Sequence, residues 1–197
     1  MTMQILLALV GFAFVTSITP GPNNLMLMAS GANFGFRRTV PHMLGIGLGF
    51  TAMVVLVGLG LAGLFDRWPV LRLVLTVVSV AYMLWLAWKI ATAAGPGGAR
   101  AGARPLSFLQ AASFQWVNPK AWAMALTATT VYTLPGNALS VLLVGLVFGA
   151  VNLPSVSVWT LLGQAVARLL RDARALRVFN VTMAVLLVLS LWPVLRL

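Results

Sequence analysis

Residues 114–121 read FQWVNPKA, and the lysine of this stretch, Lys120, carries the only formal charge between Pro105 and Ala167. The uncharged region is long enough for two membrane crossings of about 20 residues each. Lys120 lies about midway between Pro105 and the turn at Pro135, so a helix rise of about 1.5 Å per residue puts it roughly 20 Å from either end of its segment. A lysine side chain is too short to bring its ammonium to the headgroups from that depth. Because a cation at mid-membrane is costly and usually functional, we expect Lys120 to face a partner or a watery cavity. The alternative is a lysine tied to backbone carbonyls for structure alone.

The composition is that of an integral membrane protein. The chain has 197 residues, of which 61% are hydrophobic and only 8% are charged, whereas soluble domains have about 25% charged residues. It contains no cysteine, which excludes disulfides and thiolate metal sites, and we expect neither a metal nor a cofactor. The net charge of +11 comes mainly from short loops between apolar runs, which fits membrane orientation better than nucleic-acid binding.

We predict an all-α polytopic membrane protein with about six transmembrane helices in a single domain over residues 1–197. The expected spans cover residues 3–31, 39–64, 69–90, 107–133, 138–163 and 177–195. The prolines of Thr19–Asn24 interrupt the first span, and Asn118-Pro119 interrupts the fourth. The chain does not start like a secretory signal, so the first segment is expected to remain, as a full span or as a re-entrant hairpin.

The two halves of the chain resemble each other. We predict repeat one over residues 1–94, a Gly- and Ala-rich linker over 95–105, and repeat two over 106–197. Pro22 and Pro119 open the halves, and Gly45 and Gly49 of the second span recur as Gly145 and Gly149 of the fifth. Three spans per half would insert the second copy upside down. Inverted repeats with broken helices near the midplane are typical of transporters.

The basic residues are distributed unevenly between the loops. The first, third and fifth loops contain Arg37, Arg38, Lys89, Arg100, Arg104, Arg168, Arg171, Arg174 and Arg177. The other side has Arg67, Arg72 and Arg196. Because positive residues prefer the cytoplasm, we expect the first set to be cytoplasmic and both termini to be periplasmic. Residues 168–177 are expected to form a short amphipathic helix whose arginines bind anionic lipid.

The two breaks predict a binding site. Freed carbonyls at Pro20 and Pro22 need partners other than lipid, and a new half-helix is expected to start near Pro22. Asn118 suits an N-cap and Pro119 the first helical position. Helix starts carry partial positive charge, so two of them together with Lys120 favour a ligand with a carboxylate.

Further residues complete the expected site and its frame. The predicted substrate site comprises Thr19, Pro20, Gly21, Pro22, Asn23, Asn24, Asn118, Pro119 and Lys120. Asn23, Asn24 and Asn118 would take the amino group of the substrate. Trp116 and Trp122 either line an apolar pocket or fill the core. Gly45, Gly49, Gly145 and Gly149 are expected at close-packing helix faces, and Asn152 and Pro154 at a hinge. His42 is expected at the membrane interface, with a proton relay as the alternative.

Several of these motifs resemble one family. Thr19-Pro20-Gly21-Pro22-Asn23, Gly35-Phe36-Arg37-Arg38, the glycines of 45–49, Ala81-Tyr82-Met83-Leu84 and residues 114–121 are similar, in order, to the LysE/RhtB family of amino-acid exporters. The resemblance implies export of amino acids or related metabolites across the bacterial cytoplasmic membrane. It also implies about six hydrophobic helices and a homo-oligomer.

The chain departs from the family at one position. Many members have aspartate after the Thr-Pro-Gly-Pro motif, whereas this chain has Asn23, and its only acids, Asp66 and Asp172, fall in predicted loops. Proton-coupled export would therefore need Lys120 or His42 to titrate, or the substrate to carry the proton. The absence of an acid in the spans argues against a strongly cationic substrate and favours neutral amino acids or a related carboxylate.

The sequence thus predicts a secondary-active exporter that works by alternating access, with the segment from Pro20 to Pro22 as its moving joint. A non-catalytic membrane subunit or a channel for small solutes is the alternative. An enzyme is disfavoured because the predicted spans hold no cluster of Asp, Glu, His or Cys.

Overall fold

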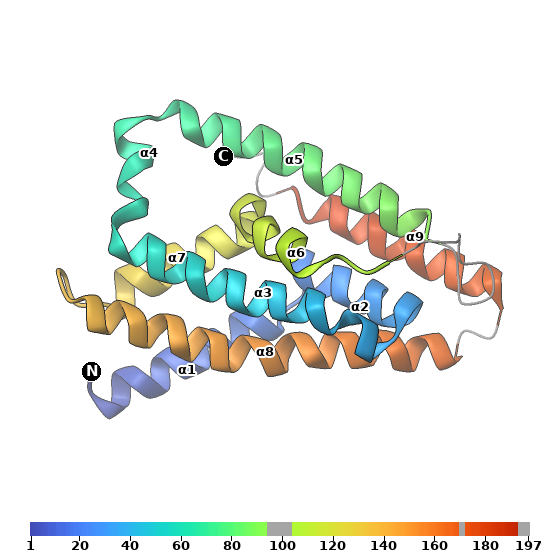
Figure 1. Ribbon diagram of the computed structural model, residues 1–197, viewed down its shortest axis with the longest axis horizontal. Coiled ribbons are helices and arrows are strands. Elements are labelled where there is room, and N and C mark those ends of the chain that lie inside the picture. The colour runs from blue at the N-terminus through green and yellow to red at the C-terminus, as the bar shows by residue number, and fades with distance from the viewer. Residues whose placement is uncertain (94–103, 170–171, 193–197) are drawn as a thin grey trace.

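The computed structural model describes residues 1–93, 104–169 and 172–192, which are helical apart from turns and short connections (Figure 1). The first half contains α1 (Met3–Ile18), α2 (Pro22–Phe34), α3 (Phe36–Leu56), the π-helical turn η1 (Val57–Leu61), α4 (Gly63–Arg67) and α5 (Val70–Ala91). The second half contains α6 (Phe108–Phe114), the 3₁₀ turn η2 (Gln115–Val117), α7 (Pro119–Tyr132), α8 (Ala138–Leu169) and α9 (Ala173–Leu189). The predicted all-α class is confirmed for these residues. The linker predicted at 95–105 lies mostly outside them.

Long apolar helices account for three of the predicted spans, or four if the bent pair of α1 and α2 is one span. Among the described residues, Phe36–Leu61, Leu73–Ala91 and Ala138–Leu169 are each long and apolar enough to cross a membrane. α1 and α2 pass the same test only as a pair, bent by 54° at their junction. The span predicted at 107–133 is divided into α6, η2 and α7, and α9 has 17 residues. Six crossings therefore stay a prediction.

Both breaks form where the sequence predicts them. α1 ends at Ile18, and α2 begins at Pro22. α7 begins at Pro119, and the Asn118 side chain accepts a hydrogen bond from the backbone N–H of Lys120 at 3.1 Å. Proline suits the first position of a helix because its φ is already helical and its missing N–H would be unpaired there. Local chemistry thus starts a new helix at each break.

The longer helices α3, α5, α8 and α9 run roughly along the long axis of the molecule, whereas α4 runs across it (Figure 1). α3 packs against α8, α1 and α2 also pack on α8, α6 packs on α3, and α5 pairs with α9. The junction of α2 with α3 lies at one end of the molecule, together with the end of α5 and the approach to α6 (Figure 1). The turn between α7 and α8 lies at the opposite end. Both broken segments are therefore held inside a frame of longer helices.

Glycines permit the closest helix crossings. Gly45 and Gly49 face α6, where an added Cβ would meet the backbone of Phe108 or Ala112. A Cβ on Gly145 would meet the side chain of Val55 on α3, 2.7 Å away.

The α2–α8 crossing is also close, and the sequence did not predict it. A Cβ on Gly31 would meet the carbonyl oxygen of Thr160, and a Cβ on Gly163 would meet that of Met28. The two helices therefore touch backbone to backbone.

Two expectations about the second half need revision. The span predicted at 138–163 is longer than expected, because α8 continues as one helix through Asn152 and Pro154 to Leu169. The hinge at Asn152 and Pro154 stays a prediction. The separate amphipathic helix predicted over residues 168–177 is wrong, because α8 includes Arg168 and a new helix, α9, begins at Ala173. Asp172 starts α9 by accepting a hydrogen bond from the backbone N–H of Ala175. Arg174 and Arg177 belong to α9, and Arg171 lies outside the described residues.

Candidate functional site

The ammonium of Lys120 reaches from α7 to the end of α1. Its Nζ donates to the carbonyl oxygen of Thr19 at 2.8 Å, to Thr19 Oγ1 at 2.9 Å and to the carbonyl oxygen of Pro20 at 3.4 Å. An ammonium has three N–H donors, so all three have oxygen partners here. One lysine therefore joins the two predicted breaks.

Other side chains pair with the carbonyls that the first break frees. Asn24 Nδ2 donates to the carbonyl oxygens of Ser17 and Thr19 at 2.8 and 2.7 Å. Trp159 Nε1, on α8, donates to the carbonyl oxygen of Ile18 at 3.0 Å. Together with the ammonium, these donors satisfy the backbone carbonyls at the end of α1, which would otherwise be unpaired in an apolar setting.

The start of α2 lies beside the same ammonium. Gly21 is the N-cap of α2 and provides no side-chain hydrogen bond to its first turn. A Cβ on Gly21 would lie 2.7 Å from Lys120 Cδ and 3.1 Å from its Nζ. Glycine therefore leaves the space that the lysine side chain occupies. It also leaves the positive end of α2 without a side-chain cap.

A reciprocal amide pair connects α2 with η2. Asn23 Nδ2 donates to Gln115 Oε1 at 2.8 Å, and Gln115 Nε2 donates back to Asn23 Oδ1 at 3.2 Å. Gln115 Nε2 also donates to the carbonyl oxygen of Ala111 at 2.9 Å. Gln115 is fully buried, so its amide depends on these partners. The pair fixes the first turn of α2 against the residues that lead into the second break.

The local electrostatics favour an anion. Lys120 lies in the first turn of α7, so its charge is at the positive end of its own helix, which is unfavourable. The N-terminal, positive end of α2 lies beside the Lys120 side chain. The carbonyl groups at the C-terminal, negative end of α1 accept from the ammonium and offset part of this positive charge. The first turns of α2 and α7 and the ammonium of Lys120 thus lie together at the C-terminal end of α1.

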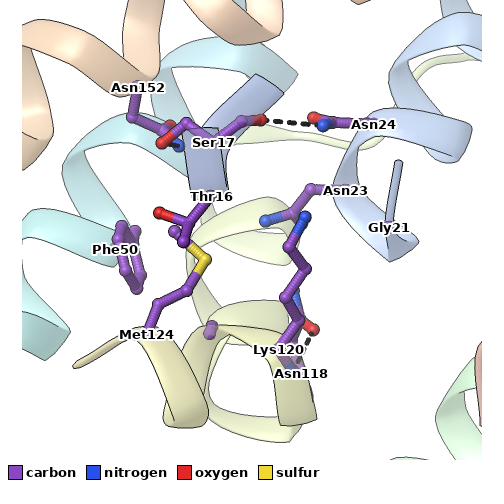
Figure 2. A pocket seen from close by; sticks show the side chains of 11 residues that line it. Thr16, Ser17, Gly21, Asn23, Asn24, Phe50, Asn118, Lys120, Met124 and Asn152 are labelled. Carbon is purple, nitrogen blue, oxygen red and sulfur yellow. Dashed lines mark hydrogen bonds between the residues drawn. The ribbon is translucent and has the colours of Figure 1, made fainter. Parts of the chain in front are cut away.

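A small cavity of about 20 Å³ lies between the breaks, and the side chain of Lys120 extends from α7 along it (Figure 2). Its lining comprises Thr16, Ser17, Gly21, Asn23, Asn24, Phe50, Asn118, Lys120, Ala121, Met124 and Asn152. This volume holds a water molecule, whereas small-molecule sites have about 300 Å³ or more. In this structure the cavity is therefore too small to hold an amino acid.

Asn152 places an unpaired acceptor at this cavity. Its side chain is 5% exposed, and its Nδ2 donates to Ser17 Oγ at 3.2 Å. Its Oδ1 is buried and has no hydrogen-bond partner in the described structure. Because buried polar atoms are nearly always paired, this oxygen is suited to a donor from a ligand or a water molecule. The sequence singled out Asn152 only as part of a hinge, although an amide inside a long apolar run was the available signal.

The structure brings five of the predicted site residues to the cavity, namely Gly21, Asn23, Asn24, Asn118 and Lys120. Thr19 and Pro20 supply oxygen acceptors to the ammonium. Pro22 and Pro119 each occupy the first position of a helix.

Trp116 and Trp122 do not line this cavity. Their rings contact each other with centroids 6.0 Å apart, and both pack against an apolar cluster that includes Leu9, Met124 and Phe148. Trp122 Nε1 donates to the carbonyl oxygen of Trp116 at 2.8 Å. Both rings thus pack against the core in this structure, and their role in an apolar substrate pocket stays a prediction.

Comparisons with known proteins agree with the motifs. The sequence model of a family described as LysE type translocator matches residues 5–190. A protein of Salmonella choleraesuis named cysteine/O-acetylserine efflux protein is 33% identical over 200 residues, covering 95% of this chain and 96% of its own. A protein of the same name from Escherichia coli K12 is 34% identical over 194 residues, with the same coverage. No solved structure matches the chain.

Proposed function

This chain belongs to the LysE type translocator family, and we propose that it exports small neutral amino acids across the bacterial cytoplasmic membrane as a secondary-active carrier. The relatives named cysteine/O-acetylserine efflux proteins support an α-amino acid with a short polar side chain as the substrate. The observation that carries the proposal is the meeting of both broken helices at Lys120, beside a polar cavity.

Lys120 would bind the substrate carboxylate. Its ammonium now pairs with uncharged oxygens, and a carboxylate with a full negative charge competes well for the same donors. The uncapped first turn of α2 would add backbone N–H groups, as helix starts commonly do for anions. The cavity lining contains no acidic side chain that would repel the carboxylate.

Asn152 would accept a hydrogen bond from the substrate ammonium. Its Oδ1 is the unpaired acceptor at the cavity, whereas the amide of Asn24 already donates to two carbonyls. Asn23 and Asn118 would assist after their present partners are released. A neutral acceptor suits the single ammonium of a zwitterion, and the lack of a lining carboxylate disfavours a second cation on the substrate.

Substrate binding would couple to movement through the same lysine. The cavity is too small for an amino acid, so the substrate enters only when the helices move apart. Lys120 holds α7 to the end of α1 through Thr19 and Pro20. When the substrate carboxylate replaces Thr19 and Pro20 as the partner of the Lys120 ammonium, α7 is no longer held to the end of α1. The joint from Pro20 to Pro22 can then turn. This exchange is the proposed basis of alternating access.

The proposed topology has six crossings in two inverted repeats with both termini periplasmic. Helix pairing supports it in part, because α1 packs on α8 as α6 packs on α3, and α3 pairs with α8 and α5 with α9. In two inverted three-helix repeats, α6, α8 and α9 correspond to α1, α3 and α5, so a contact of α1 with α8 has its counterpart in a contact of α6 with α3. The extensive packing of α2 on α8 has only a small counterpart between α7 and α3. Arg37, Arg38 and Lys89 lie at the end of the bundle where α2 meets α3, which supports a cytoplasmic location for that end.

Two further interactions stay proposals. Arg168, Arg171, Arg174 and Arg177 would bind anionic lipid at the cytoplasmic face. A homo-oligomer would form in the membrane, as the family resemblance implies.

Counterflow in proteoliposomes tests the proposed function. Vesicles loaded with unlabelled O-acetyl-L-serine or L-cysteine should accumulate the labelled compound transiently from outside, and the initial rate should saturate with concentration. A carrier requires this result. Flux that rises linearly, without counterflow, would instead support the channel alternative.

A further inference from the structure

A second, larger cavity of about 660 Å³ lies between α2, α3, α5 and the start of α6. Its polar lining includes Ser30, Asn33, His42, Lys89, Arg104 and Gln110. This volume is within the range of small-molecule sites and far exceeds that of the cavity at Lys120. Its lining includes Asn33 and Phe34 at the end of α2 and Thr92 and Ala93 after α5, and these helix ends lie together at one end of the molecule (Figure 1).

His42 is the unusual residue of this cavity. Its side chain is 2% exposed, and neither Nδ1 nor Nε2 has a hydrogen-bond partner in the described structure. Both nitrogens are covered in this structure, so a partner in the cavity reaches them only when the imidazole or its neighbours shift. Because buried polar atoms are nearly always paired, such a partner would satisfy the imidazole.

The charges around the cavity define the chemistry of that partner. Lys89 and Arg104 both line it, and the lining contains no acidic side chain. The Lys89 ammonium also lies 4.6 Å from the centroid of the Trp85 ring, which holds it near the end of α5. A ligand with a carboxylate is therefore attracted. The neutral imidazole offers one donor for that carboxylate and one acceptor for an ammonium, which matches an amino-acid zwitterion.

α2 contributes to both cavities. Asn23, in its first turn, lines the cavity at Lys120, whereas Met26 and Asn33 line the larger one. Asn23 and Asn33 are about 15 Å apart along the helix. The segment that leads into the second break also contributes to both, because Gln110 of α6 lines the larger cavity and Asn118 lines the smaller one.

We propose that the larger cavity is a loading site, which binds the zwitterionic amino acid through His42 before it reaches Lys120. Lys89 and Arg104 attract the carboxylate, and the imidazole of His42 makes the hydrogen bonds. The proposal rests on the proposed export function, because the basic residues at this end mark it as the cytoplasmic side, from which an exporter takes its substrate.

The single histidine of the chain makes a direct test available. Protein labelled with ¹⁵N-histidine in nanodiscs would be titrated with O-acetyl-L-serine and, separately, with its methyl ester, which lacks the carboxylate. We expect the imidazole resonances to shift saturably with the amino acid and not with the ester. The same titration of Lys120→Ala should give the same shift, because the loading site does not include Lys120.

The outcomes separate the two proposals. Export by the wild-type protein, without an imidazole shift at concentrations that saturate transport, would overturn the loading site and leave the export function intact. An equal shift with the methyl ester would overturn it too. An unchanged shift in a Lys120→Ala protein that still exports at the wild-type rate would instead overturn the role of Lys120 and support the loading site.

A kinetic comparison gives an independent readout. His42→Leu should raise the half-saturating concentration on the loading side by about 100-fold or more with little change in maximal rate, because two hydrogen bonds to charged groups are lost. His42→Gln keeps a donor and an acceptor and should restore part of that loss. An unchanged half-saturating concentration in a folded His42→Leu protein would contradict the proposal.

Discussion

Lys120 Nζ lies 2.8 Å from the carbonyl oxygen of Thr19, although the two residues are 101 positions apart in the sequence. The contact joins the end of one broken helix to the start of the other. It gives Lys120 two potential roles, as a structural cap for α1 and as the carboxylate-binding group of a transporter. The predictions below are chosen to separate these roles.

Replacement of the lysine is the first test. Lys120→Ala should lower counterflow by about 100-fold or more, because an interaction with a charged group is lost at the step where the carboxylate binds. Membrane insertion should be retained, since the breaks are made by proline and by Asn118, which remain. Counterflow and the amount of folded protein, measured by size-exclusion chromatography in detergent, check both statements.

Thr19→Val is the matched control for Lys120→Ala. It removes the Oγ1 acceptor and leaves the Thr19 carbonyl in contact with the ammonium. Under the transport role, this variant should keep its export rate within a few-fold of wild type. Full counterflow by Lys120→Ala would contradict the carboxylate-binding assignment.

The sequence was sufficient to predict both breaks because their causes are local. Proline removes a donor and fixes φ wherever it occurs, and Asn118 caps the residues that follow it. Lys120 could be singled out for a similar reason, because a charged residue in a long apolar run can be recognised from the sequence before its partners are known.

Residues supplied by other helices could not be assigned in advance. Gln115 pairs with Asn23 across 92 positions, and Trp159 reaches the carbonyl of Ile18 across 141. In the sequence each is one polar or aromatic residue in an apolar segment, and only folding brings it to the break. The burial of His42 could not be assigned in advance either, because it depends on how the helices pack around α3. Its position at the membrane interface stays a prediction.

Gly21 provides a second test, which moves the ammonium without removing it. A Cβ on Gly21 would lie 2.7 Å from Lys120 Cδ, and a lysine side chain is flexible enough to move aside. Gly21→Ala should therefore lower transport by about tenfold while thermal stability changes little. Gly11→Ala is the control, because nothing lies within 4 Å of its added Cβ. Wild-type transport by a folded Gly21→Ala protein would show that the lysine position is not critical.

Asn152 is expected to recognise the substrate ammonium. Asn152→Leu should raise the half-saturating concentration for O-acetyl-L-serine by about tenfold, since the acceptor Oδ1 is lost. It should matter less for the hydroxy acid analogue, which has no ammonium. Ser17→Ala removes only the partner of Asn152 Nδ2 and serves as the control. Equal effects of Asn152→Leu on both compounds would assign the residue to packing.

The pair of Asn23 and Gln115 should be energetically coupled. Asn23→Leu leaves the buried amide of Gln115 partly unpaired, so we expect a loss of about 1–3 kcal/mol in stability. Gln115→Leu should cost a similar amount, and the double variant should cost less than the two together. Unfolding of the purified proteins by denaturant in detergent, carried out as a double-mutant cycle, measures the coupling. Strict additivity would mean that the pair contributes no interaction.

The crossing of α2 with α8 should be the least tolerant place in the described fold for an added methyl group. A Cβ on Gly31 would meet the carbonyl oxygen of Thr160, and a Cβ on Gly163 would meet that of Met28. Backbone atoms cannot move aside as a lysine side chain can, so the helices must separate. Gly31→Ala and Gly163→Ala should each cost about 1–3 kcal/mol or more and lower the yield of folded protein.

Gly47→Ala is the matched control for this crossing. Gly47 is buried within α3, but an added Cβ there would have only Leu153 Cδ1 nearby, at 3.7 Å, which is an ordinary contact. This variant should retain wild-type stability or gain slightly, because alanine favours a helix over glycine by about 1 kcal/mol. Thermal unfolding of the three variants in the same detergent makes the comparison. If Gly31→Ala melted with Gly47→Ala at the wild-type temperature, α2 would have to lie farther from α8 than described, and the frame that holds Asn23 and Asn24 beside Lys120 would be lost with it.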